Sequence, residues 1–233
     1  MNHDSALART AFLDHDSPEV RRFVGQALHG AGTSDRERAV RLYYAVRDQI
    51  RYEIYGADLT RRGLTASQVV RTGKGLCIHK SVLYVSALRC VGIPGRLVFT
   101  DVRNHLSSEA VREFIGGDIF HYHALTSLRL DRWIRATPVF NRLLCRLYRI
   151  EPMEFDGTAD SVYHPYDERG GTHMELIKEH GEFDDLPYDE VLAGLRREHP
   201  RIFVEGTDDR FVAGSLAADA DAEAARTAAP RTD

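Results

Sequence analysis

The sequence has few cysteines, a single tryptophan and no long run of apolar residues. Its three cysteines are Cys77, Cys90 and Cys145, and an odd count in a chain of 233 residues does not fit a disulfide framework. No Cys-x-x-Cys pair occurs, which argues against a structural zinc site built on cysteines. At least one of the three could therefore be a working thiol.

Charge and hydropathy argue against further classes of protein. The net charge is −4 and the arginines are scattered among acidic residues, so binding to nucleic acid or to an acidic membrane surface is not favoured. No apolar segment reaches the roughly 18–20 residues that a membrane-spanning helix needs. The first residues, Met-Asn-His-Asp-Ser, lack the basic patch and apolar stretch of a signal peptide. We therefore expect a cytoplasmic protein without a nucleic-acid or membrane partner.

The order of the predicted elements indicates an α+β fold. Helices are expected in residues 17–50, strands and the longest apolar helix in a core at 51–150, and turns with a short amphipathic helix in an extension at 151–205. Because the elements do not alternate as βαβ units, we predict an antiparallel sheet. Residues 1–205 should form one domain. Residues 206–233 bury too little apolar surface to offset their ordering entropy, which predicts a disordered tail.

A segment that is apolar nearly all round, residues 77–91, predicts a buried helix with Cys77 at its start. Backbone N–H groups and the helix dipole favour a thiolate at such a position. The preceding loop contains Gly73 and Gly75, which let the backbone approach closely. The alternative is that Cys77 is a small buried apolar residue, as the other two cysteines are expected to be.

Two histidines, His121 and His123, alternate along a predicted strand and should share one face of it. Either could be a base, a metal ligand or a structural residue, and no third metal ligand is evident nearby. His164, Asp167 and His173 form a second cluster, but their spacing matches no standard metal site, which favours solvated loop residues. We therefore predict no metal and no other cofactor.

Two blocks of sequence resemble the transglutaminase-like superfamily. The first joins Gly-Leu-Cys at residues 75–77 to Leu-Arg-Cys-Val-Gly-Ile-Pro-Gly-Arg at 88–96. The second joins His-Ala-Leu at 123–125 to Trp-Ile-Arg-Ala-Thr-Pro at 133–138. The segments 101–106 and 154–157 are also similar to a bacterial branch of this family, and the resemblance covers roughly residues 35–190.

The resemblance implies a papain-like core, in which a central helix that carries the cysteine packs on an antiparallel sheet. Cys77 would attack a carbonyl group to give a thioester, and His123 would act as general base and then as general acid. Water or an amine would resolve the acyl-enzyme. The family usually has an aspartate where this sequence has Thr137, whose hydroxyl can accept the histidine N–H but carries no charge.

The strand connection decides whether Thr137 can reach His123. A two-residue turn at Asp131-Arg132 would place Thr137 on the face away from His123. A three-residue connection would pair Thr137 with Leu125, on the His123 face, and we predict this register. Asn141 is the reserve orienting residue, and His121 is the reserve base.

Five further polar residues are candidates for substrate contacts. Asp101, Arg103, Asn104 and His105 follow a predicted strand, and we expect them in the wall of the site, where they would bind polar groups of the substrate. Their alternative role is to cap a loop. Gln68 could bind the oxyanion, as glutamines do in papain-like enzymes, or it could be a solvated helix residue.

We conclude from the sequence that the chain is a cysteine-dependent enzyme of acyl transfer or amide hydrolysis. Its expected partner is a peptide, amine or small-molecule acyl substrate, free or carrier-bound. Thr137 motivates one alternative, a binding or scaffold module of the same fold that has lost catalysis. The presence of both Cys77 and His123 favours the enzyme.

Overall fold

The computed structural model describes residues 5–105, 107–148, 150–162, 174–205 and 209–228. His164, Asp167 and His173, the second candidate metal cluster, lie outside the described residues. The helices are η1 Ser5–Leu7, α1 Pro18–Ala27, α2 Asp35–Gln49, α3 Ala66–Thr72, α4 Cys77–Cys90, α5 Glu109–Ile115, α6 Arg142–Tyr148, α7 Tyr188–Glu198, η2 Pro200–Ile202 and α8 Leu216–Ala228. The strands are β1 Arg51–Tyr52, β2 Lys74–Gly75, β3 Gly95–Asn104, β4 Ile119–Arg129, β5 Trp133–Ala136 and β6 Met174–Phe183.

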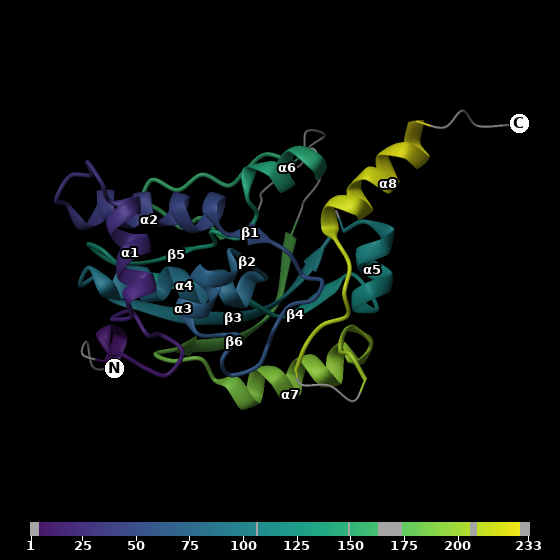
Figure 1. The fold of residues 1–233 in the computed structure, drawn as a ribbon, viewed down its shortest axis with the longest axis horizontal. Helices are drawn as coiled ribbons and strands as arrows, with labels where there is room; N and C mark the ends of the chain where they lie inside the picture. Colours follow the sequence, from purple (N-terminus) through teal and green to yellow (C-terminus); the bar gives the residue numbers. More distant parts are fainter. Residues whose placement is uncertain (1–4, 106, 149, 163–173, 206–208, 229–233) are drawn as a thin grey trace, which may run out of the picture.

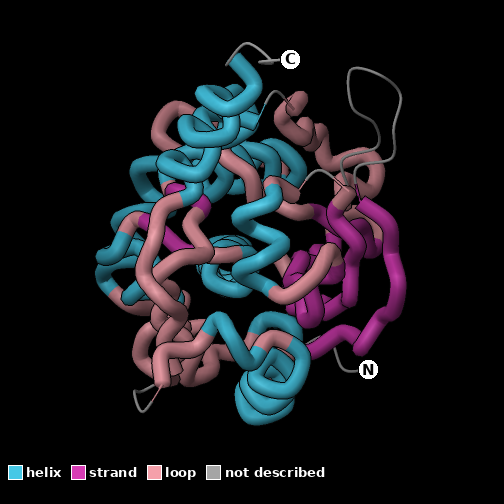
Figure 2. Tube along the Cα trace, turned by 90° about the vertical axis from the view of Figure 1, so that its right-hand side faces the viewer, coloured by secondary structure: helices cyan, strands magenta, loops and turns pink. Residues whose placement is uncertain are grey.

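The main sheet is antiparallel and has the strand order β5-β4-β3-β6. A separate parallel pair joins β1 to β2 just before α4. Figure 2 shows the main sheet along one side of the molecule and most helices over the other side. The α+β class with an antiparallel sheet, predicted from the order of the elements, is confirmed.

Helix starts coincide with residues whose side chains can cap a helix. The hydroxyl groups of Ser17, Ser34, Thr65 and Ser108 each accept a hydrogen bond from a backbone N–H in the first turn of the helix that follows. Pro18 occupies the first position of α1, where a missing N–H costs nothing. These local signals explain where the four helices begin.

Helix α4 lies at the centre of the molecule (Figure 1). It packs against β3 and β4 on one side and against α1, α2 and α3 on the other. Every residue from Cys77 to Arg89 is buried, as a helix that is apolar nearly all round predicts. The one buried lysine, Lys80, donates hydrogen bonds to the carbonyl groups of Arg47 and Ile50 at the end of α2. A helix fixed on all sides is a rigid support for the cysteine at its start.

Strand β6 forms in the region 151–205, for which the sequence predicts turns and a short amphipathic helix but no strand. Its residues from Glu175 to Glu179 are all exposed, so it shows no apolar alternation. It is an edge strand, and its pairing with β3 supplies the order that its own sequence does not encode.

The predicted disordered tail is also different in the structure, because residues 216–228 form helix α8. Leu216 and Ala220 are buried, and the hydroxyl of Tyr148 donates a hydrogen bond to the Leu216 carbonyl. The hydroxyl of Tyr55 donates to Asp219 at 2.7 Å. Contacts with segments distant in the sequence therefore order this helix.

Within the described part of the chain, no helix is both long and apolar enough to cross a membrane.

Candidate active site

The segment before α4 fixes the position of Cys77. Gly73 ends α3 in the left-handed conformation, with φ of 65°, which glycine adopts without strain. A Cβ on Gly75 would lie 2.5 Å from the Cβ of His79, so only glycine fits there. Leu76 then precedes α4 without a side-chain cap, and Cys77 is the first helical residue. The first-turn N–H groups of α4 are therefore left without a capping side chain near the thiol.

The Cys77 thiol is buried, with 8% of the residue exposed. Burial raises its pKa to about 11, and hydrogen bonds from the backbone N–H groups of Ala124, Ile78 and Cys77 itself oppose that rise. The expectation that the helix start would favour a thiolate is therefore not met, because desolvation outweighs the N–H groups. The contact with Ala124 brings the sulfur against β4, beside His123.

His123 pairs with Thr100 of β3 and is almost fully buried. It lines the same cavity as Cys77. Burial lowers the pKa of its imidazole to about 4, so the ring is neutral at pH 7. Its Nε2 atom is buried and has no hydrogen-bond partner among the described residues. The site thus contains a neutral thiol and a neutral imidazole.

A β-bulge separates the two histidines of β4. The register between β3 and β4 shifts between Thr100 and Val102, so His121 and Tyr122 lie opposite Asp101 alone. Tyr122 adopts φ of 54°, the only positive φ of a non-glycine residue in the described chain. His121 and His123 therefore do not follow the simple alternation that the sequence predicts, although both line the cavity with Cys77.

Asp101 holds this bulge and does not line either cavity beside Cys77 and His123. One carboxylate oxygen accepts the Tyr122 N–H at 3.1 Å and lies 2.6 Å from His180 Nε2. The other lies 3.1 Å from His121 Nδ1. Although burial opposes it, hydrogen bonds from His180, Tyr122 and His121 lower the pKa of Asp101. Its expected contact with substrate is replaced by a role in the framework.

Thr137 follows directly after β5. Arg129 pairs with Trp133 and Thr126 with Ala136, so the connection has three residues, as predicted, and the ladder ends at Ala136, one residue before Thr137. The Thr137 backbone N–H donates to the Ser161 carbonyl at 2.9 Å. Its hydroxyl is buried and finds no partner in the described residues. Thr137 lines neither of the cavities that contain His123, so the orientation of His123 by Thr137 stays a prediction.

The other predicted site residues divide into two groups. Asn104 lines a cavity that also contains His123. Arg103 instead forms an ion pair with Glu175, His105 Nε2 lies 3.6 Å from the same carboxylate, and Gln68 lines a different cavity, beside His79. Their long polar side chains extend toward solvent rather than into the apolar cavity.

Asn141 has a structural partner. Its side-chain carbonyl accepts the backbone N–H of Tyr52 at 3.0 Å, within the core. This bond ties the start of α6 to β1, so Asn141 Oδ1 is engaged by the backbone. Tyr52 in turn lines the cavity with Cys77, a position that the sequence analysis missed because nothing in a short aromatic segment distinguishes it.

His199 is another residue that the sequence analysis missed. Its Nε2 accepts the backbone N–H of His121 at 3.1 Å, so its Nδ1 is the protonated nitrogen that donates to the Ile115 carbonyl at 2.8 Å. Burial lowers the pKa of His199. A neutral His199 therefore fixes the backbone at His121 from the end of α7.

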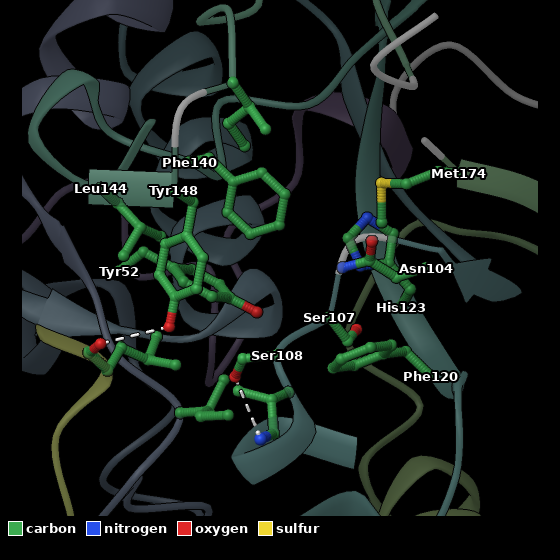
Figure 3. Close-up of a pocket in the computed structure, with 14 residues that line it drawn as sticks. Tyr52, Asn104, Ser107, Ser108, Phe120, His123, Phe140, Leu144, Tyr148 and Met174 are labelled. Carbon is green, nitrogen blue, oxygen red and sulfur yellow. Dashed lines mark hydrogen bonds between the residues drawn. The ribbon is translucent and has the colours of Figure 1, made fainter. Parts of the chain in front are cut away.

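Two cavities meet at His123. The first contains Cys77 and His121, and the second lies between β4, α5, α6 and α8 (Figure 3). They share Tyr52, Ile54, Phe120 and His123 as lining residues. No group of three or more His, Cys, Asp or Glu side chains in the described ranges is arranged to hold a metal ion.

Comparisons with known proteins match the chain to one family. The model of the transglutaminase-like superfamily matches residues 22–138, half of the chain. A solved structure from Cytophaga hutchinsonii, provisionally assigned as a cysteine protease, superposes with a TM-score of 0.47 and 13% identity, over 82% of this chain and 50% of that one. The chain thus spans about half the length of that protein. No curated protein matches the chain.

Proposed function

The chain belongs to the transglutaminase-like superfamily, and we propose that it transfers or hydrolyses acyl groups through a thioester on Cys77. The observation that carries the proposal is the shared cavity of Cys77 and His123, two residues from different elements. A thiol at a helix start and a neutral imidazole in one apolar cavity are the parts that general-base attack on a carbonyl requires.

The reaction begins with a neutral pair. The Cys77 sulfur attacks the carbonyl carbon of the substrate while His123 takes the thiol proton. The imidazolium then gives this proton to the leaving amine or alcohol as the carbon–heteroatom bond breaks, and a thioester remains. Water or an amine attacks the thioester, again with His123 as base, and the thiol is regenerated by proton return. Because the pKa of His123 is about 4, proton transfer accompanies the attack rather than preceding it.

Two further roles follow within this proposal. The Thr137 hydroxyl orients His123. When substrate binds, a side-chain rotation brings this hydroxyl to His123 Nε2, and the two buried atoms form a hydrogen bond. The uncapped N–H groups of the first turn of α4 stabilise the oxyanion, in place of Gln68, which lines another cavity. An uncharged orienting group stabilises an imidazolium less than a carboxylate would, which suits a base that is protonated only transiently.

One alternative base has specific support. His121 lines the cavity with Cys77, and Asp101 lies 3.1 Å from its Nδ1, an Asp–His pair that His123 does not have. We favour His123 because the Cys77 thiol lies against the backbone N–H of the adjacent Ala124. The two assignments differ in the effect of replacing each histidine.

The test is acylation of the protein by p-nitrophenyl acetate. We expect release of nitrophenol in a burst and an acetyl group on Cys77, located by mass spectrometry of peptides. Cys77→Ala should abolish the burst, and Cys145→Ala should leave it unchanged because Cys145 lies outside both cavities. His123→Ala should slow acylation at least about 100-fold, the usual contribution of a general base, while His121→Ala should not.

The opposite results have clear meanings. A larger loss in His121→Ala than in His123→Ala would move the base to the Asp101–His121 pair. If Cys77 is no more readily acetylated than Cys145, the enzyme proposal fails, and the fold is better explained as a binding or scaffold module.

A further inference from the structure

We propose that the second cavity binds the acyl part of the substrate, and that this acyl group is uncharged and largely apolar. The inference rests on the proposed thioester chemistry at Cys77 and adds the chemical class of the substrate. It concerns the cavity shown in Figure 3, which is lined by 14 residues.

The lining of this cavity is predominantly apolar. Ile54, Val111, Phe120, Phe140 and Leu144 contribute from five separate segments, and α8 adds Leu216. None of the lining residues is an Asp, Glu, Lys or Arg, and its histidine, His123, is neutral because burial lowers its pKa. A charged group moved from water into such a cavity would lose its hydration without gaining a partner. An apolar chain would gain free energy from the same transfer.

Some of the polar atoms in the lining are already occupied. The hydroxyl of Ser108 accepts the Val111 N–H, and the hydroxyl of Tyr148 donates to the Leu216 carbonyl, as the dashed lines in Figure 3 show. The hydroxyl of Ser107, in contrast, is buried and has no partner among the described residues. It can serve one hydrogen-bonding group on an otherwise apolar acyl chain.

The position of the cavity relative to Cys77 supports an acyl group as the occupant. The two cavities share Tyr52, Ile54, Phe120 and His123. A carbonyl carbon at the Cys77 sulfur therefore has its substituents beside His123, at the entrance to the second cavity. The acyl chain can extend past His123 into this space, while the acceptor approaches from the cavity that contains His121.

The test measures acylation of the unmodified protein by a series of p-nitrophenyl esters, from acetyl to octanoyl, with the rate of the nitrophenol burst as readout. Each methylene that enters the cavity should raise the acylation rate about fourfold, so hexanoyl, which has four more methylenes than acetyl, should react at least roughly tenfold faster when two or more of them enter. The mono-p-nitrophenyl ester of adipic acid matches hexanoyl in length but ends in a carboxylate. It should react no faster than the acetyl ester.

Two variants on α6 form a matched pair. Leu144→Trp fills the cavity and should remove the dependence on chain length while acetylation continues. Leu143→Trp lies next to it, but Leu143 is 53% exposed, and the dependence should be unchanged. Circular dichroism of both variants checks that they are folded.

The outcomes separate the two proposals. If Cys77 is acylated but hexanoyl, adipoyl and acetyl esters react at equal rates, the acyl-cavity inference is wrong and the proposed thioester chemistry stands. If no ester acylates Cys77, the proposed function fails and the inference falls with it. A loss of the length dependence in Leu143→Trp as large as in Leu144→Trp would also overturn the assignment to this cavity.

Discussion

The carboxylate of Asp101 accepts a hydrogen bond from the backbone N–H of Tyr122 at 3.1 Å, and Tyr122 is held at φ of 54°. This bond lies between the two histidines of β4. A strained backbone at a bulge persists only where its surroundings stabilise it, and here the stabilising group is a buried carboxylate that also lies close to His121 and His180. The backbone geometry of β4 next to His123 therefore depends on a side chain that does not line either cavity of the site.

Replacing Asp101 should affect stability and activity together. Asp101→Asn removes one of the oxygens that the bulge requires, which should lower the free energy of unfolding by about 2 kcal/mol. We expect acylation of Cys77 to fall at least roughly tenfold under conditions where the variant is folded, because His123 moves. Urea unfolding and the nitrophenol burst measure the two effects. Asp118→Asn is the control, since its exposed pair with Arg103 should contribute less than about 0.5 kcal/mol.

Asp101 also predicts a pH dependence of stability. The pKa of Asp101 is lowered in the folded protein. The contribution of its carboxylate to stability is therefore fully present above its pKa in the unfolded chain, about 3.9, and is lost as the pH falls through its pKa in the folded protein. Asp101→Asn should therefore reduce the loss of stability below pH 4. An equal loss of stability below pH 4 in the unmodified protein and in Asp101→Asn would contradict this role of Asp101.

The orphaned hydroxyl of Thr137 gives a prediction in which stability and activity change in opposite directions. Thr137→Val removes a buried hydroxyl without a partner, so the free energy of unfolding should rise by up to about 1 kcal/mol. If this hydroxyl orients His123 during the reaction, acylation should fall about 5- to 30-fold, the value of one hydrogen bond. Unfolding curves and burst rates of the same preparations test this.

Thr126→Val is the matched control for Thr137→Val. The Thr126 hydroxyl is also buried without a partner in the described chain, but Thr126 is three positions from His123 in β4, so its side chain lies on the opposite face of the strand. It should gain similar stability and keep its full activity. Equal activity of the two variants would exclude a role for Thr137 in orienting the base.

The neutral imidazole of His123 predicts an unusual pH profile. A general base must be unprotonated, and the pKa of His123 is about 4. The value of kcat/KM for an acyl ester should therefore stay level from about pH 9 down to pH 6, without the inflection near 6.5 of an ordinary histidine. An inflection near 6.5 that persists in His121→Ala would contradict the buried, neutral state of His123.

Stability should respond to pH in the same range as an ordinary histidine. The pKa of His79 is also about 4, so both rings take up a proton on unfolding below pH 6.5, and stability falls as the pH drops from 6.5 toward 4. His79→Gln should weaken this dependence and leave the kcat/KM profile unchanged, because His79 lies outside both cavities of the site.

Lys80 should be important for stability but not for chemistry. Its Nζ atom donates to the carbonyl groups of Arg47 and Ile50 at 2.9 and 2.6 Å, deep in the core. Lys80→Met would leave both carbonyl groups without this donor and should lower the free energy of unfolding by about 3 kcal/mol. Lys178→Met on the exposed face of β6 should change it by less than about 0.5 kcal/mol. A large loss of Cys77 acylation in a folded Lys80→Met protein would show a role beyond packing.

The sequence by itself determined the local elements that carry their own signals. Side-chain caps at Ser17, Ser34 and Thr65 fix three helix starts, and a segment that is apolar nearly all round and ends at Gly92 fixes the buried helix α4 with Cys77 at its start. These features depend on residues a few positions apart, so pattern reasoning finds them. The three-residue connection after β4 was also predicted, from the need to bring Thr137 to the His123 face.

Tertiary structure decided everything that depends on distant neighbours. Strand β6 and helix α8 have no sufficient signal of their own and are ordered by β3, Tyr55 and Tyr148. The protonation of Cys77 is set by desolvation among side chains from several elements, which outweighs the local effect of the helix start. The register of β3 against β4 shifts at Asp101 and forms the bulge. This pairing between distant strands decides how His121 and His123 are placed relative to each other. Local propensity acts over one or two turns, whereas burial and strand pairing join residues that the sequence keeps apart.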